Sequence, residues 1–146
     1  MKIFLDASSL FKLYHREADS SVISHIFTSG TVSGIFLSEL AKIEFESTVW
    51  KKVRTKEISE LDAKTILQHF DHDSGKYSFV PVDSLIIRQS RSLIAKYGVD
   101  GLRTLDSTQL ATSIILKDKS SFFITTDKLL DSFFKRESLP TYIGST

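Results

Sequence analysis

Four acidic residues that lie far apart in the sequence each stand beside an apolar or helix-like segment. Asp6 follows the apolar run KIFL, and Asp127 follows FFITT. Asp106 lies in LRTLDSTQLATSI, and Glu44 lies in SELAKIEFES. Carboxylates that gather in one place repel each other and are costly to desolvate, so such a cluster persists when a cation neutralises it. If these four residues meet, the chemistry to consider is that of a bound cation.

The residue types favour a hard divalent cation. The chain has no cysteine, which excludes thiolate ligands and disulfides. Carboxylate oxygens are the ligands that Mg²⁺ and Mn²⁺ prefer. Such an ion can polarise a phosphate oxygen and lower the pKa of a bound water, and a second ion can hold the leaving oxygen. The four carboxylates together could therefore support a reaction at phosphate.

Each acidic residue also has an ordinary structural explanation. Asp6 and Asp127 could cap the helices that follow them, and Asp106 is followed by Gln109 in a pattern typical of a capping box. Glu44, taken alone, could be a solvated helix residue. Individually these explanations are the better ones, and only the joint pattern favours a shared site.

The four residues can share a site only if the fold brings them together. Short apolar runs predict strands, and periodic apolar segments that begin at polar caps predict helices. The expected strands cover residues 2–5, 34–37, 77–82, 121–125 and 141–143. The expected helices cover residues 8–14, 20–28, 38–54, 59–73, 84–96, 104–117 and 128–134.

This alternation of strands and helices predicts an α/β protein whose parallel sheet is covered on both faces. In such sheets, ligands bind beyond the carboxyl ends of the strands. Asp6 and Asp127 each follow the carboxyl end of an expected strand, so both should lie at the same edge of the sheet. The length of 146 residues and the 41% of hydrophobic residues fit one compact domain that spans residues 1–146.

The charge and hydropathy of the chain limit its partners. The net charge is +1, so nucleic-acid binding would need local basic patches. Two sets are candidates, although both are equally compatible with solvated helix faces: Lys51, Lys52, Arg54 and Lys56, and Arg88, Arg91, Lys96 and Arg103. No apolar run approaches the roughly 20 residues that span a bilayer, and the N-terminus does not read as a signal peptide. A cytoplasmic protein without a membrane partner is expected.

The order and local context of these residues resemble a PIN domain, and within that group the VapC-type toxins of toxin–antitoxin pairs. The opening FLDASSLFKLYHRE is similar to the first motif of the family, with its acid at Asp6 and a hydroxyl at Ser8. LSELAKIEFESTVWK resembles the helix that carries the second acid, which falls on Glu44, with Glu39 as the alternative. Five residues turn a helix by about 140°, so only one of the two glutamates can face the site.

The second half of the chain carries the other two motifs. LRTLDSTQLATSIIL is similar to the third motif and places its acid at Asp106; Ser107 and Gln109 stand where the family usually has Ala and His. FFITTDKLL resembles the fourth motif, with Thr125 as a hydroxyl and Asp127 as the last acid. The resemblance covers essentially the whole chain.

The resemblance implies a three-layer α/β/α sandwich with a mostly parallel sheet of about five strands. It further implies a Mg²⁺- or Mn²⁺-dependent endoribonuclease that is the toxin of a type II pair, forms a homodimer and is inhibited by a small antitoxin. Asp6, Glu44, Asp106 and Asp127 would be the catalytic residues and the metal ligands, and Ser8 and Thr125 would orient carboxylates or waters. Flanking cations would hold the RNA phosphates, and proximity to the motifs suggests Lys12, Arg16, Lys52 and Lys128.

Two other interpretations stay open, and two further ones are disfavoured by the sequence. The chain could be a PIN-like RNA-processing nuclease without an antitoxin, or a catalytically inactive PIN fold that binds RNA or protein. An aspartyl-phosphate phosphatase would need a second Asp two residues after the first, where this chain has Ser8. The segment QHFDHDSGK has the residue types of a transition-metal site, but its spacing and the following Ser-Gly favour an ordinary helix end.

Overall fold

The structure of the protein is a computed structural model that describes residues 1–15, 25 and 31–142. In these residues, four parallel strands form one sheet in the order β3-β2-β1-β4. The strands are β1 (Lys2–Leu5), β2 (Gly34–Ser38), β3 (Ser78–Val80) and β4 (Phe122–Ile124). The first strand of the chain is therefore central, with β2 on one side and β4 on the other.

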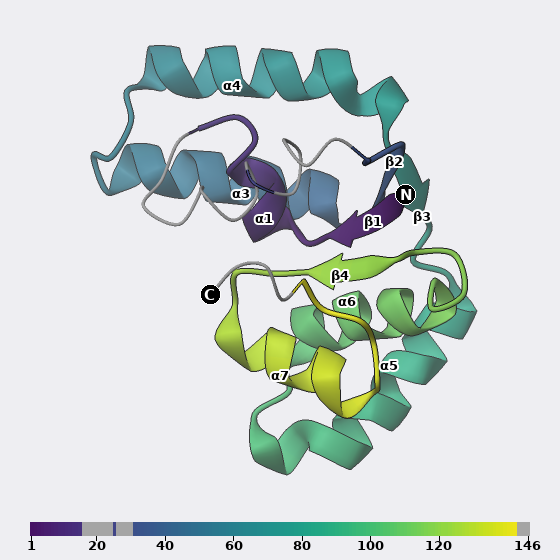
Figure 1. The fold of residues 1–146 in the computed structure, drawn as a ribbon. Coiled ribbons are helices and arrows are strands. Elements are labelled where there is room, and N and C mark those ends of the chain that lie inside the picture. Colours follow the sequence, from purple (N-terminus) through teal and green to yellow (C-terminus); the bar gives the residue numbers. More distant parts are fainter. Residues whose placement is uncertain (16–24, 26–30, 143–146) are drawn as a thin grey trace.

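Helices cover both faces of this sheet. One face packs against α1 (Ala7–Phe11), α3 (Ala41–Arg54) and α4 (Glu60–Asp73), and the other against α5 (Ser84–Tyr97), α6 (Thr104–Ile115) and α7 (Lys128–Arg136) (Figure 1). Short 3₁₀ helices, η1 (Ser74–Lys76) and η2 (Gly98–Asp100), follow α4 and α5. The prediction of a three-layer α/β/α sandwich is confirmed.

The alternation of side chains along the strands separates two hydrophobic cores. Ile3 and Leu5 of β1 point to the α1/α3/α4 side, whereas Phe4 between them packs on the α5/α6/α7 side. In β4, Ile124 and Phe123 divide between the two cores in the same way. All five side chains are at most 4% exposed. Residues buried on both faces explain why these strands read as continuous apolar runs.

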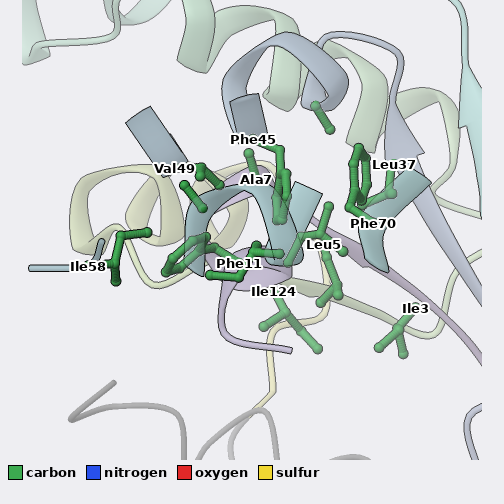
Figure 2. Packing of buried hydrophobic residues seen from close by; sticks show 14 residues of the cluster. Ile3, Leu5, Ala7, Phe11, Leu37, Phe45, Val49, Ile58, Phe70 and Ile124 are labelled. Carbon is green, nitrogen blue, oxygen red and sulfur yellow. The ribbon is translucent and has the colours of Figure 1, made fainter. Parts of the chain in front are cut away.

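An aromatic cluster fixes α1, α3 and α4 to each other. The ring of Phe45 in α3 is completely buried and stacks on Phe70 of α4 with 4.3 Å between the ring centroids. Phe11 of α1 and Tyr14 lie 5.9 and 5.4 Å from the same ring. Figure 2 shows Phe11, Phe45 and Phe70 gathered with Leu5 of the sheet. Phe45 is next to Glu44 in sequence, so this cluster sets the position of the helix that carries Glu44.

Several expected elements differ in their bounds. The helix expected over 8–14 is the shorter α1, followed by a turn, and the helix expected from Ser38 begins at Ala41. Thr141 and Tyr142 are not in a strand, and Ile143 lies outside the described residues, so the described sheet has four strands rather than about five. The helix expected over 20–28 also lies outside the described residues, except for His25. Within the described ranges, no helix has the length and apolarity to cross a bilayer.

Removal of the Phe45 ring tests the role of the aromatic cluster. We expect Phe45→Ala to lower the free energy of unfolding by about 3–5 kcal/mol, because the substitution leaves a cavity and removes the contacts of the ring with α1 and α4. Urea denaturation followed by circular dichroism measures this change. Leu61→Ala is the control, since Leu61 is 73% exposed and its substitution should change stability by less than about 0.5 kcal/mol. Equal effects of the two substitutions would contradict this account of the packing.

Candidate active site

The first acid, Asp6, is buried at the carboxyl end of β1. Its side chain caps α1 by accepting a hydrogen bond from the Ser9 backbone N–H at 3.0 Å. The Ser8 hydroxyl lies 2.9 and 3.0 Å from the two carboxylate oxygens, and the Thr125 hydroxyl donates to Oδ2. Burial raises the pKa of Asp6, while the bonds from Thr125, Ser9 and Ser8 oppose that rise. The carboxylate is thus held in one orientation from both sides.

The register of the sheet explains the bond between Asp6 and Thr125. Leu5 is paired with Ile124, so the next residue of each strand lies at the same edge of the sheet. The Asp6 N–H donates to the Ile124 carbonyl at 3.3 Å and continues the pairing by one bond. The expectation that β1 and the strand before Asp127 end together therefore holds, and Ser8 and Thr125 both contact Asp6.

Glu44 lies in the first turn of α3, where it is half-buried. Gln109 of α6 donates from Nε2 to Glu44 Oε1 at 2.6 Å. Burial, together with the charges of Asp6 and Asp106, raises the pKa of Glu44 to about 7, although the bond from Gln109 acts in the opposite direction. Glu44 is therefore close enough to two other site acids to be repelled by both.

Asp106 does not cap α6, contrary to the ordinary explanation of its motif. The helix begins at Thr104 with the extended residue Arg103 as its N-cap, so Asp106 is already in the first helical turn. Its carboxyl is half buried, and burial raises its pKa, followed by the charges of Asp127 and Asp6. The positive charge of Arg103 acts in the opposite direction. Asp106 thus faces the other acids rather than the end of its own helix.

Asp127 combines capping with proximity to the site. It is exposed, and its Oδ1 accepts from the backbone N–H groups of Leu129 and Leu130 at 2.9 and 3.1 Å, which caps α7. Its own N–H donates to the Thr125 hydroxyl at 3.0 Å, and that hydroxyl donates in turn to Asp6. Its negative charge acts on Asp106. Capping and membership of an acidic cluster are compatible in this residue.

The structure brings Asp6, Glu44, Asp106 and Asp127 together at the carboxyl edge of the sheet. Across residues 1–15, 25 and 31–142, no three Asp, Glu or His side chains are close enough to ligate one ion directly. The donor set nevertheless fits a hard cation, because Mg²⁺ keeps several waters and needs only one or two carboxylates as direct ligands. A cation here would also relieve the repulsion that raises the pKa of Glu44 and Asp106.

The placement of the two glutamates favours Glu44 over Glu39. Glu39 follows β2 at the surface, and its carboxylate forms an ion pair with Lys42 at 2.6 Å. Its side chain is 47% exposed. Glu44, in contrast, is held by Gln109 beside Asp6 and Asp106.

The basic residues proposed from proximity have different environments. Lys128 is exposed directly after Asp127, at the start of α7. Lys52 lies over the Phe11 ring at 5.2 Å and pairs with Glu57 at 3.6 Å, so it packs against the protein. Lys12 is half-buried at the end of α1, and Arg16 lies outside the described residues. Of Lys12, Lys52 and Lys128, which the structure describes, Lys128 has the environment that best suits contact with an anion.

Two residues of the site were not predicted from the sequence. Gln109 holds Glu44, and the Thr126 hydroxyl donates to Ser8 at 3.0 Å, which supports the residue that contacts Asp6. The second hydroxyl in the TTD segment was the available signal for Thr126. The position of Gln109 depends on how α3 and α6 meet, for which the local sequence holds no signal.

The segment QHFDHDSGK behaves as an ordinary helix end. His69, His72 and Asp73 lie in the last turns of α4, and Asp73 Oδ2 accepts a hydrogen bond from the Tyr14 hydroxyl at 2.8 Å. The Tyr14 hydroxyl is also bonded to that of Tyr77. Burial raises the pKa of Tyr14, so this hydroxyl stays neutral and joins α4 to the end of α1.

Comparison with solved structures finds the same fold in several proteins. VapC20 of Mycobacterium tuberculosis, a sarcin–ricin loop cleaving toxin, is 13% identical with a TM-score of 0.66 over 90% of this chain and 94% of its own. FitAcB of Neisseria gonorrhoeae is 14% identical with a TM-score of 0.68 over 96% of each chain. VapBC2 of Rickettsia felis, whose structure was solved bound to a DNA fragment from its promoter, is 13% identical with a TM-score of 0.58 over 97% of this chain and 96% of its own.

The sequence itself matches no protein-family model and no curated protein. The likeness in structure spans almost the whole chain, and the chain has the fold of VapC-type PIN-domain toxins. At this level of identity the comparison shows the fold alone, so the chemistry of the site has to be argued from its own residues.

The raised pKa of Glu44 predicts how stability depends on pH. The unfolded chain releases the Glu44 proton near 4.5 and the metal-free folded protein near 7, so stability falls as the pH rises between these values. We expect Glu44→Gln to raise the free energy of unfolding by about 1–2 kcal/mol above that range, after allowance for partial solvent screening, and to change it little below the range. Denaturation of metal-free protein across the pH range measures both effects.

Glu39→Gln is the matched control for this measurement. It removes the charge of an exposed glutamate that lies just before the start of the same helix. Its effect on stability should be small and should lack the rise above neutral pH. If Glu39→Gln and Glu44→Gln gave the same dependence of stability on pH, the account in which burial and the other acids raise the pKa of Glu44 would be wrong.

Proposed function

We propose that this protein is a Mg²⁺- or Mn²⁺-dependent endoribonuclease that hydrolyses RNA phosphodiester bonds as the toxin of a type II toxin–antitoxin pair. The observation that carries the proposal is the mutual repulsion of acids at the carboxyl edge of the sheet: burial and the charges of Asp6 and Asp106 raise the pKa of Glu44, and the charge of Asp127 acts on Asp106. The fold shared with VapC20, a toxin that cleaves the sarcin–ricin loop, supports the same class of reaction.

In the proposed mechanism, Asp6 and Asp106 would be the principal ligands of the ion, directly or through water. Glu44 and Asp127 would complete its surroundings or hold a second ion. A bound divalent ion supplies polarisation of a phosphate oxygen and a lowered pKa for an attacking water. Thr125 and Ser8 keep the Asp6 carboxylate oriented, and Gln109 does the same for Glu44.

The environment of Asp6 supports its place among the ligands. Three neighbours donate hydrogen bonds to its carboxylate and favour the charged form, which is the form that binds a cation. Asp106 approaches from the start of α6, across the edge of the sheet, and repels both Asp6 and Glu44. A divalent ion among these carboxylates would neutralise part of their negative charge, and the repulsion that is relieved would stabilise the metal-bound state.

The proposal extends to the partners. A protein with this fold and activity would be harmful to its own cell unless inhibited, so we propose a small antitoxin protein as the inhibitor. We also propose that the active form is a homodimer. Size-exclusion chromatography with light scattering would test the homodimer, and co-expression with the adjacent open reading frame would test the antitoxin.

Substitution of the principal acids should abolish cleavage. We expect Asp6→Asn and Asp106→Asn to lower the rate of RNA cleavage in Mg²⁺ or Mn²⁺ by at least about 100-fold, and Thr125→Val to lower it by about 10-fold. EDTA should stop the wild-type reaction. Cleavage of labelled RNA followed on denaturing gels measures these rates, and Asp118→Asn, which changes an exposed acid, is the control. Full activity of either site variant, or of the wild type in EDTA, would end the proposal.

Binding of the ion can be measured without catalysis. Mn²⁺ should raise the melting temperature of the wild type, because a ligand that binds only the folded state stabilises it, and the rise should grow with Mn²⁺ concentration. The shift should disappear in Asp6→Asn and persist in Asp118→Asn. A shift of the same size in both variants would place the ion elsewhere on the protein.

Expression in cells connects the site to the target. We expect induced wild-type protein to arrest growth and produce discrete RNA ends, whereas Asp6→Asn does neither. Sequencing of RNA 5′ ends identifies the substrate. Growth arrest by the Asp6→Asn variant would favour an inactive PIN fold that acts by binding.

A further inference from the structure

A pocket opens beside the acidic cluster, at the start of α6. Its volume is about 390 Å³, and it is lined by Arg103, Thr104, Leu105 and Asp106. Asp106 also belongs to the acidic cluster, so the pocket and the candidate active site share this residue. A strand of RNA whose scissile phosphate lies at the acids would extend over neighbouring surface, and this pocket adjoins Asp106.

Arg103 supplies the positive charge of the pocket. Its side chain is exposed, and it forms no hydrogen bond or ion pair with any residue that the structure describes. Its charge nevertheless reaches Asp106, where it lowers the pKa against the effect of burial. By contrast, Arg136 is bound to Asp100 at 3.0 Å. The Arg103 guanidinium is therefore close to the site and still able to bind an anion.

The surroundings of Arg103 suit a nucleotide rather than a bare anion. Leu105, in the pocket wall, is 52% exposed. Leu129 is 42% exposed and packs against Gly101, with its Cδ2 atom 3.4 Å from the point where a Cβ of Gly101 would lie. Gly101 has a φ of 103°, which the chain adopts easily only at glycine, and it leads directly into Leu102 and Arg103. Leu105 shares the pocket wall with Arg103, and burial of its exposed apolar surface against a base or ribose would be favourable.

The electrostatic problem of the site calls for such a cation. Four carboxylates at one edge repel an RNA backbone, and the net charge of +1 supplies no general attraction. A phosphate has to be held by a positive group within a few ångströms of the acids. The guanidinium is well suited, since its planar fork donates two parallel hydrogen bonds to two phosphate oxygens.

We propose that Arg103 binds an RNA phosphate next to the scissile one, with Leu105 against the adjoining nucleoside, so that the pocket is a substrate subsite. This inference rests on the proposed ribonuclease function and adds to it a binding residue at the N-cap of the helix that carries Asp106. Binding through one phosphate contact gives a defined dependence on salt, which separates it from a general effect of charge.

The test is the binding of a fluorescein-labelled single-stranded RNA of mixed sequence in EDTA, where metal-dependent cleavage is stopped. Fluorescence anisotropy measures the affinity at several salt concentrations. We expect Arg103→Gln to weaken binding by about five- to tenfold and to reduce the slope of log affinity against log salt by about 0.7, the loss of one contact with a single strand. Arg103→Lys should keep the slope and recover part of the affinity, because it keeps the charge without the fork.

Lys64→Gln is the control. Lys64 is an exposed cation on α4, which covers the face of the sheet opposite to α6. Its substitution removes one positive charge and should leave affinity and slope close to the wild type. An unchanged slope in Arg103→Gln, an equal loss in Lys64→Gln, or no binding by the wild type would each overturn the proposal.

The cleavage assay separates this inference from the function on which it rests. With Mg²⁺ or Mn²⁺, Arg103→Gln should raise KM with a smaller change in kcat, since a contact made equally in the ground state and transition state affects mainly KM. If the wild type bound RNA through Arg103 but cut none, the subsite would stand and the nuclease proposal would fail. If the wild type cut RNA and Arg103→Gln had the wild-type KM, the subsite would fail and the nuclease proposal would stand.

Discussion

The hydrogen bond from Thr125 to Asp6 joins the ends of two parallel strands, and the candidate site is built around it. Asp6 is only 6% exposed, so its charge depends on the donors that surround it. Those donors come from α1 and from Thr125 after β4, which are adjacent only because the sheet places the first strand of the chain beside the last described one. The sheet order thus determines whether a carboxylate can be kept at this edge.

The repulsion among the acids is a cost that the two hydrophobic cores have to offset. Two unit charges roughly 6 Å apart repel by about 3 kcal/mol at the effective dielectric typical of partly buried sites. The rise of the Glu44 pKa to about 7 shows how the metal-free protein limits this cost, since a proton on Glu44 removes one of the charges. Proteins commonly have lower stability at functional sites. Here the stability is lost through repulsion among acids that take no part in the hydrophobic cores.

The sequence predicted the framework better than the contacts between helices. Strands buried on both faces, such as residues 2–5, read as apolar runs, and their carboxyl ends located Asp6 and Asp127 correctly. Both residues cap a helix while they lie at the acidic edge of the sheet, so capping does not exclude a place in the acidic cluster. Asp106 lies two residues inside α6, so the capping explanation of its motif is wrong, and the charges of Asp6 and Asp127 act on it instead. Gln109 could not be assigned, because its partner Glu44 lies 65 positions away in another helix.

The start of α6 reconciles two opposite electrostatic demands. The acids need positive charge to be stable together, and the proposed RNA substrate would need positive charge to approach them. Arg103 is the extended N-cap of α6 and Asp106 lies in the first turn, so one end of the helix presents a cation whose charge acts on the acid. Because the two residues flank the start of one helix, a phosphate held by Arg103 in the proposed subsite would lie close to Asp106. The start of a helix would then help to orient the substrate for in-line attack.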